Sequence, residues 1–272
     1  MHPRLRALEA LRLTDPDRKI AATRALADSA DPARLGDGAA VRVPGDEAGV
    51  PGRPERPERV GATAVPRRSP FTAEGRAALV HSICHIEFNA INLALDALWR
   101  FDGMPPAYYQ DWLRVAAEEA GHFALLHAHL LSLEHRYGDF PGHDGLWTMC
   151  EKTAGDVLAR MALVPRTLEA RGLDATPLIQ AKLRRVDTPD AHAAVAILDV
   201  ILRDEVGHVA IGNHWYRWLC ARAGQDPEAL YPQLVARYEA PRLKPPFNHE
   251  ARRRAGFSAG ELRALDDAAA PR

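Results

Sequence analysis

The chain contains little cysteine. Among its 272 residues only Cys84, Cys150 and Cys220 are cysteines, and they are widely separated and odd in number. Such a set argues against a disulfide framework, against a cysteine-type zinc site and against a rubredoxin-like module. The simplest interpretation is that the protein resides in the reducing environment of the cytoplasm.

Long apolar runs and an excess of charge of one sign are also missing. The sequence has no stretch of about 18 uncharged apolar residues, which predicts that the chain does not span a membrane. The amphipathic N-terminus, residues 1–9, lacks the apolar run of a signal peptide. A formal net charge of −1 gives no general attraction to nucleic acid or to a membrane surface.

Strand-like alternation and solenoid repeats are not found either, whereas helical periodicity is strong. It predicts four long helices, at residues 72–101, 106–137, 146–171 and 189–223. Shorter helices are expected within residues 1–35, near 177–185, over 227–238 and from Ser258 onward. The fold class is therefore expected to be all-α.

Proline is concentrated in one segment. Residues 41–70 contain six prolines and, from Arg53 to Arg68, five arginines. Because proline lacks an N–H group and blocks regular helix, this segment is expected to be an extended strap over the helices. A flexible linker is equally compatible with the composition. The expected parts are residues 1–40 as a helical extension, 41–71 as the strap or linker, 72–224 as a four-helix unit and 225–272 as a C-terminal extension.

The most informative motif is a pair of Glu-x-x-His units inside two of the long helices. Glu119 and His122 form the first unit, and Glu205 and His208 form the second. Residues i and i+3 of a helix lie about 60° apart around the axis and about 4.5 Å apart along it, so both side chains can reach one metal ion. A lone glutamate at a core position precedes each unit, namely Glu87 and Glu169. Such a set of four carboxylates and two imidazoles is typical of a dimetal site in a four-helix bundle.

The apolar surroundings of these motifs distinguish metal binding from its alternative, buried ion pairs without metal. A single Glu-x-x-His on a polar helix face would indicate only a solvated stripe. Here the core-facing neighbours are apolar, such as Val115 and Phe123 in one helix and Leu198 and Val209 in the other. Ionised glutamate on a buried face is costly unless it is paired or bound to metal. Metal binding is therefore favoured over buried ion pairs without metal.

An acid precedes the glutamate of each unit, Glu118 before Glu119 and Asp204 before Glu205. Metal-bound histidine usually donates its outer N–H group to a carboxylate, which fixes the ring orientation. Asp204 is therefore predicted to orient His122, and Glu118 to orient His208. The alternative is that both acids are surface charges beside an acidic site.

Other polar residues of the long helices are expected to be peripheral. His81 and His85 lie one helical turn apart, and His85 points away from Glu87 by about 200°. Both are predicted to have supporting or surface roles. Asp96 and Asp199 are predicted to lie on solvated faces, and Cys84 to be a small buried hydrophobic residue.

At the paired motifs the chain resembles the ferritin-like superfamily of dimetal-carboxylate proteins, over residues 72–223. This resemblance implies a ferritin-like four-helix bundle with N- and C-terminal extensions. Three segments more closely resemble an uncharacterised bacterial group, domain-of-unknown-function family 455. They are HSICHIEFNA at 81–90, LEARGLD at 168–174 and PPFNHEARRRAGF at 245–257.

The superfamily resemblance implies two iron ions, or a manganese–iron pair, held by Glu87, Glu119, His122, Glu169, Glu205 and His208. The four glutamates would also be the catalytic groups. The expected activity is an O₂-dependent oxidase or hydroxylase of a small molecule or modified nucleoside, similar in style to tRNA-hydroxylase-type diiron monooxygenases. Expected partners are O₂, an unknown substrate and an electron-donor protein. No nucleic acid other than tRNA is expected, and the chain is expected to be a monomer or homodimer.

Two other functions fit the same ligand set. One is iron handling, as ferroxidase, store or peroxide scavenger, and the other is a binding protein whose metal only braces the helices. The extensions of about 70 and about 50 residues would crowd a storage shell but could shape a substrate pocket. They favour the enzyme.

Overall fold

The structure is a computed structural model that describes residues 1–36, 38, 40–43, 45, 47–66 and 68–270. The elements of this part of the chain are all helices, and an isolated bridge between Arg59 and Gly142 is its single β-type pairing. The predicted all-α class is therefore confirmed. Pro44 and Arg67, which belong to the predicted strap, lie outside the described residues.

The chain forms two compact units, which are described separately here. Unit 1 contains residues 1–147 and 188–197, and unit 2 contains residues 148–187 and 198–272. Two helices cross from one unit into the other, α6 (Gly145–Lys152) and α9 (Pro189–Arg222). The division into four parts expected from the sequence stays a prediction.

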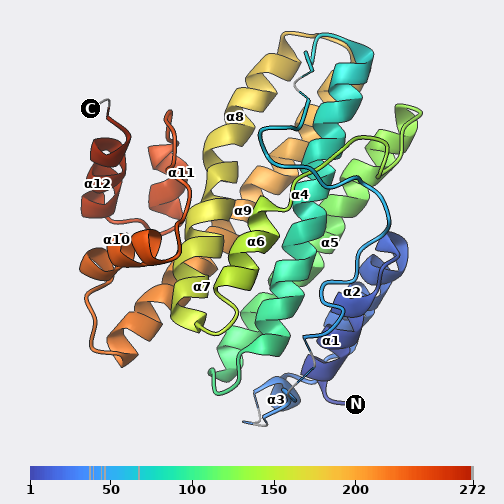
Figure 1. Ribbon diagram of the computed structural model, residues 1–272. Helices are drawn as coiled ribbons and strands as arrows, with labels where there is room; N and C mark the ends of the chain where they lie inside the picture. Colours follow the sequence, from blue (N-terminus) through green and yellow to red (C-terminus); the bar gives the residue numbers. More distant parts are fainter. Residues whose placement is uncertain (37, 39, 44, 46, 67, 271–272) are drawn as a thin grey trace. The chain divides into compact units, whose positions relative to one another are not determined.

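Unit 1 is built on two long helices, α4 (Ala73–Arg100) and α5 (Pro106–Ser132), with α1 (Pro3–Arg12), α2 (Pro16–Ser29) and α3 (Pro32–Leu35) beside them (Figure 1). The side chain of Thr72 caps α4 by accepting from Gly75 N, and Asp15 caps α2 by accepting from Arg18 N. The bounds of α4 agree with the predicted helix within one residue at each end.

Helices α4 and α5 run antiparallel. At one end the Tyr109 hydroxyl donates to Phe101 O at 2.8 Å. At the other end Gly138 N donates to His81 Nε2 at 2.9 Å. Helix α5 ends at Ser132, before the predicted Tyr137, and Glu134 just beyond it takes a left-handed φ of 61°.

The proline-rich segment lies on unit 1 as a strap. Gly52 N donates to Leu11 O at 2.8 Å, and Gly142 N donates to Glu58 O at 3.0 Å. The fully buried Lys19 joins three elements, because its Nζ donates to Leu11 O, to Gly52 O and to Asn92 Oδ1. These bonds tie the N-terminal helices and the strap to α4.

One polar residue of α4 contradicts its predicted surface position. Asp96 is fully buried and accepts from Arg100 at 2.7–2.9 Å through both of its carboxylate oxygens. His81 and His85 are buried as well, whereas Asp199 is exposed as predicted. The prediction for Asp96 is wrong because the N-terminal segment covers this side of α4, with Arg4 donating to Leu98 O and Trp99 O.

Unit 2 contains α7 (Val157–Leu163), the π-helix η1 (Val164–Glu169), α8 (Ala170–Arg184), α10 (Pro227–Arg237), α11 (His249–Arg254) and α12 (Ala259–Ala269). It also holds most of α9. Ser258 and Glu261 form a capping box at the start of α12, at the predicted position.

The third long helix differs from its prediction. It is interrupted after Lys152, and Asp156 caps the new start by accepting from Ala159 N. It then continues through Gly172 and Pro177 to Arg184, so the separate short helix predicted near 177–185 is wrong. Buried Leu173, Gln180 and Leu183 hold α8 in place, and such packing outweighs the weak helix preference of glycine and proline.

Helix α4 is long and apolar enough to cross a membrane by length and composition alone. Of its most apolar window, 72% is buried inside the structure. Most of this window therefore lies in the interior of the structure.

Candidate metal centre

One group of predicted ligands lies between α4 and α5 of unit 1. Glu87 comes from α4, and Glu119 and His122 come from α5. His122 Nδ1 lies 3.2 Å from Glu119 Oε2 and 3.4 Å from Glu87 Oε2. All three side chains are buried, Glu119 completely, and each offers a ligand atom within 4.8 Å of the others. They form a Glu/His group that could hold a metal ion.

Helical spacing and antiparallel packing bring these three residues together. Glu119 and His122 are one turn apart on α5, and α4 passes with Glu87 at the level of His122. Aromatic rings lie beside this group. Phe88 and Phe123 are next in sequence to Glu87 and His122, and their ring centroids are 5.8 Å apart. The group is therefore held in an apolar interior where water competes little for a cation.

The charges of this group are strongly coupled. Burial and then the charge of Glu119 hold the pKa of Glu87 well above its ordinary range, while His122 acts in the opposite direction. Burial by itself would lower the pKa of His122, but hydrogen bonds to Glu119 and Glu87 raise it to about 11. The group therefore retains protons that a metal ion would displace.

The other predicted ligands lie in unit 2. Glu205 and His208 occupy successive turns of α9, with His208 Nδ1 3.4 Å from Glu205 Oε1. Glu169 is the last residue of the π-helix η1. All three side chains are buried, as the paired motifs predicted.

The register of η1 and α8 against α9 places Glu169 at the level of His208. A Cβ atom on Gly212 would lie 2.6 Å from Pro165 Cβ, and one on Gly172 would lie 4.0 Å from Glu205 Oε2. From Pro165 to Gly172 the chain advances by seven residues, whereas their partners step back by seven, from Gly212 to Glu205. The two segments therefore run antiparallel past each other.

The π-helix was not anticipated from the sequence. Single wide turns of this kind occur mostly inside α-helices and often at functional sites. Thr167 Oγ1 donates to Ala162 O within the wide turn at 2.7 Å. Pro165, which has no N–H group to donate to the preceding turn, was the one local signal that could have indicated it.

The two acids predicted to orient the histidines are both half-buried. Asp204 accepts from its neighbour Arg203 at 2.8 Å, and its side chain is 21% exposed. Glu118 is half-buried on α5. Their pairing with His122 and His208 stays a prediction.

A second set of residues was only partly anticipated. His85 Nδ1 lies 2.8 Å from Tyr137 Oη, and its Nε2 lies 3.6 Å from Asp144 Oδ1. Arg53 of the strap donates to the same carboxylate at 2.5 Å. Burial raises the pKa of the Tyr137 phenol and thus keeps it protonated. The i, i+4 spacing of His81 and His85 indicated a supporting role but not this chain of contacts.

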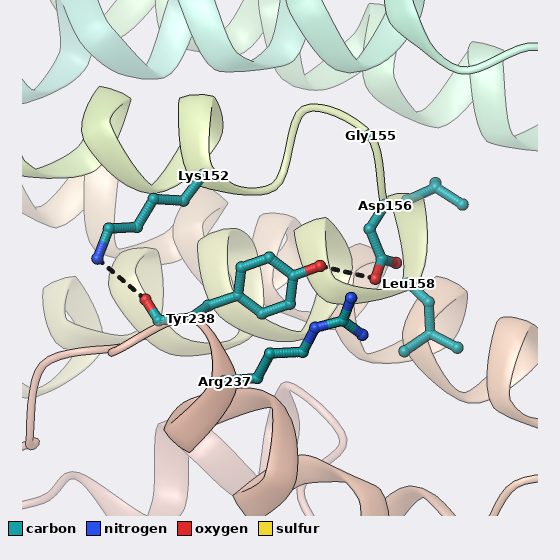
Figure 2. Close-up of a pocket in the computed structure, with 7 residues that line it drawn as sticks. Lys152, Gly155, Asp156, Leu158, Arg237 and Tyr238 are labelled. Atoms are coloured by element: carbon teal, nitrogen blue, oxygen red, sulfur yellow. Dashed lines mark hydrogen bonds between the residues drawn. The ribbon is translucent and has the colours of Figure 1, made fainter.

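Unit 2 also has a surface pocket of about 480 Å³ between α6, α7 and α10 (Figure 2). The Tyr238 hydroxyl donates to Asp156 Oδ2 at 2.9 Å, and Lys152 Nζ donates to Tyr238 O at 3.1 Å. These bonds brace the pocket walls against each other. None of the predicted metal ligands lines it.

Sequence comparison agrees with the resemblance seen in the three short segments. An "Uncharacterized protein" of Haemophilus influenzae is 52% identical to the chain over 217 residues, which cover 77% of this chain and 74% of the relative. No solved structure matches the chain. The profile of the family described as "Protein of unknown function (DUF455)" matches residues 12–263, nearly the whole sequence. The chain therefore belongs to the DUF455 family.

Proposed function

We propose that this protein is a ferritin-like dimetal-carboxylate protein that uses O₂ to oxidise or hydroxylate a small molecule or a modified nucleoside. The observation that carries the proposal is the repeated arrangement of buried ligands. In unit 1 Glu87 lies at the level of His122, and in unit 2 Glu169 lies at the level of His208. Each histidine follows a glutamate of its own helix by one turn.

The donor set fits two ions of the iron or manganese type. The six side chains offer carboxylate oxygens and imidazole nitrogens, which suit such metals, and no cysteine belongs to the group. Two iron ions would supply reductive activation of O₂. The chain's own contribution is to hold their ligands on rigid helices and to exclude water with rings such as Phe88 and Phe123.

The test is metal analysis of the natively purified protein, followed by anaerobic titration with Fe(II) and exposure to O₂. Two metal ions per chain are expected, and Glu119→Ala or Glu205→Ala should each abolish at least one. Asp111→Asn is a matched control, because Asp111 lies on the surface of α5 and pairs with Arg114 at 3.1 Å. One metal ion or none in folded, iron-replete protein would contradict a dimetal centre.

The same titration separates an enzyme from an iron store. An enzyme with one fixed centre should oxidise about two Fe(II) per chain and then require an external reductant. Size-exclusion chromatography with iron detection should show a small species with little ferric iron. Tens of ferric ions per chain that elute with a large shell would instead indicate storage.

A further inference from the structure

The outer face of α2 and α5 in unit 1 carries an apolar groove that has no role in the proposed metal chemistry. The groove has a volume of about 300 Å³. It is lined by Asp17, Ile20, Ala21, Arg24, Ala124, His127, Ala128 and Leu131. Leu131 of α5, which belongs to this lining, is 54% exposed. An exposed leucine beside a groove of small side chains is typical of an interaction surface.

Two charged residues of α2 line this groove, and they contact α5 at different levels. Asp17 Oδ1 lies 3.8 Å from His127 Nδ1, near the end of α5. Arg24 donates to Ala120 O at 3.4 Å, about two turns earlier on α5. Seven residues of helix separate Asp17 from Arg24, which corresponds to about 10 Å along the axis. Ala21 lies between them and is exposed.

Opposite charges at the two ends of one helix face make that face complementary to itself. A two-fold axis through Ala21 places each Asp17 against the Arg24 of a second, antiparallel copy. The small side chains of Ala21, Ala124 and Ala128 allow the helices to approach closely, and Leu131 supplies apolar area. Such an isologous contact is the commonest way in which soluble proteins form dimers.

We propose that this face binds a second copy of the chain, as a two-fold symmetric dimer with antiparallel α2 helices and Asp17–Arg24 pairs between protomers. The proposal is independent of the metal centre, because the face consists of residues that are not predicted ligands. The dimer therefore forms equally with and without bound metal.

A cysteine placed on the axis tests the geometry directly. Cys84, Cys150 and Cys220 are buried, so they do not compete for an oxidant in the folded protein. Ala21→Cys brings two thiols to the axis, and Cα atoms within about 7 Å of each other can form a disulfide. Mild oxidation should give a covalent dimer on a non-reducing gel. The control is Arg18→Cys, which is exposed on the same helix but does not line the groove and should remain a monomer on that gel.

A charge exchange tests the pairing by sedimentation analysis of the full chain. Asp17→Arg and Arg24→Asp each replace two attractions per dimer by two repulsions, and each should weaken dimerisation about tenfold. The double variant should restore the wild-type affinity. A monomeric wild type with no disulfide from Ala21→Cys would overturn the proposal. A dimer that is unaffected by both single exchanges would also overturn it, because its interface would lie elsewhere.

Discussion

Glu87 Oε2 of α4 lies 3.4 Å from His122 Nδ1 of α5, and the Glu119 carboxylate lies 3.2 Å from the same nitrogen. The imidazole is thus shared between two buried carboxylates. Without metal the arrangement is stable only with protons bound, because two buried carboxylates repel each other. A divalent cation can replace those protons at the same positions.

Metal binding should therefore release protons. Hydrogen bonds to Glu119 and Glu87 raise the pKa of His122 to about 11, so this imidazole holds a proton at neutral pH in the metal-free protein, and burial raises the pKa of Glu87 as well. A metal ligand must be deprotonated, and the apparent affinity should rise about tenfold per pH unit for each proton released. Calorimetric titration in two buffers of different ionisation enthalpy measures the number of protons released per metal ion bound. Equal heats in both buffers would contradict the prediction.

Asp204→Asn tests the predicted outer contact of the centre. If Asp204 orients His122, the variant should fold normally and bind metal about 10–100-fold more weakly. The measurement is competition with a chelator of known affinity. Asp199→Asn is the control, since Asp199 is an exposed acid of the same helix that accepts from Gln180. Unchanged affinity in Asp204→Asn would mean that this acid has no part in metal binding.

Gly212→Ala tests the close approach of α9 to the π-helix. The new Cβ would lie 2.6 Å from Pro165 Cβ and 3.2 Å from Arg166 N, so the backbone of η1 has to shift. Such overpacking should lower the free energy of unfolding by about 1–3 kcal/mol. Because Glu169 ends the same π-helix, metal affinity should fall as well. Gly207→Ala is the control, because a Cβ there meets no atom within 4 Å. Equal stability and metal affinity of the two variants would contradict this role of Gly212.

His81 should make the metal-free protein sensitive to acid. Burial lowers its pKa from 6.5 to about 4, and the charge of His85 adds to this effect. The unfolded chain takes up a proton below pH 6.5, whereas the folded chain does so only near pH 4. Neutral His81 therefore makes its full contribution to the free energy of unfolding above pH 6.5. This contribution, up to about 3 kcal/mol, is lost as the pH falls toward 4.

Urea denaturation across this pH range measures the effect. In His81→Gln the side-chain oxygen can still accept from Gly138 N, and the loss of stability between pH 6.5 and 4 should be smaller than in the wild type. The exposed His192 provides the control His192→Gln, which should keep the wild-type slope. Identical slopes in all three proteins would exclude His81 as the cause.

The sequence by itself determined the helical class, the extent of α4 and α9, and the start of the last helix at Ser258. These features depend on local periodicity and on side chains that bond within one turn, which a single sequence displays directly. The burial of Glu119, His122, Glu205 and His208 was predictable for the same reason.

Only the tertiary structure decided the features that depend on distant residues. The burial of Asp96 requires the N-terminal segment to cover α4, and the continuation of α8 through Gly172 and Pro177 requires packing that offsets local preference. The wide turn before Glu169 arises where Pro165 meets Gly212 of another helix. Local pattern states which face of a helix is apolar, but it does not state which segment covers that face.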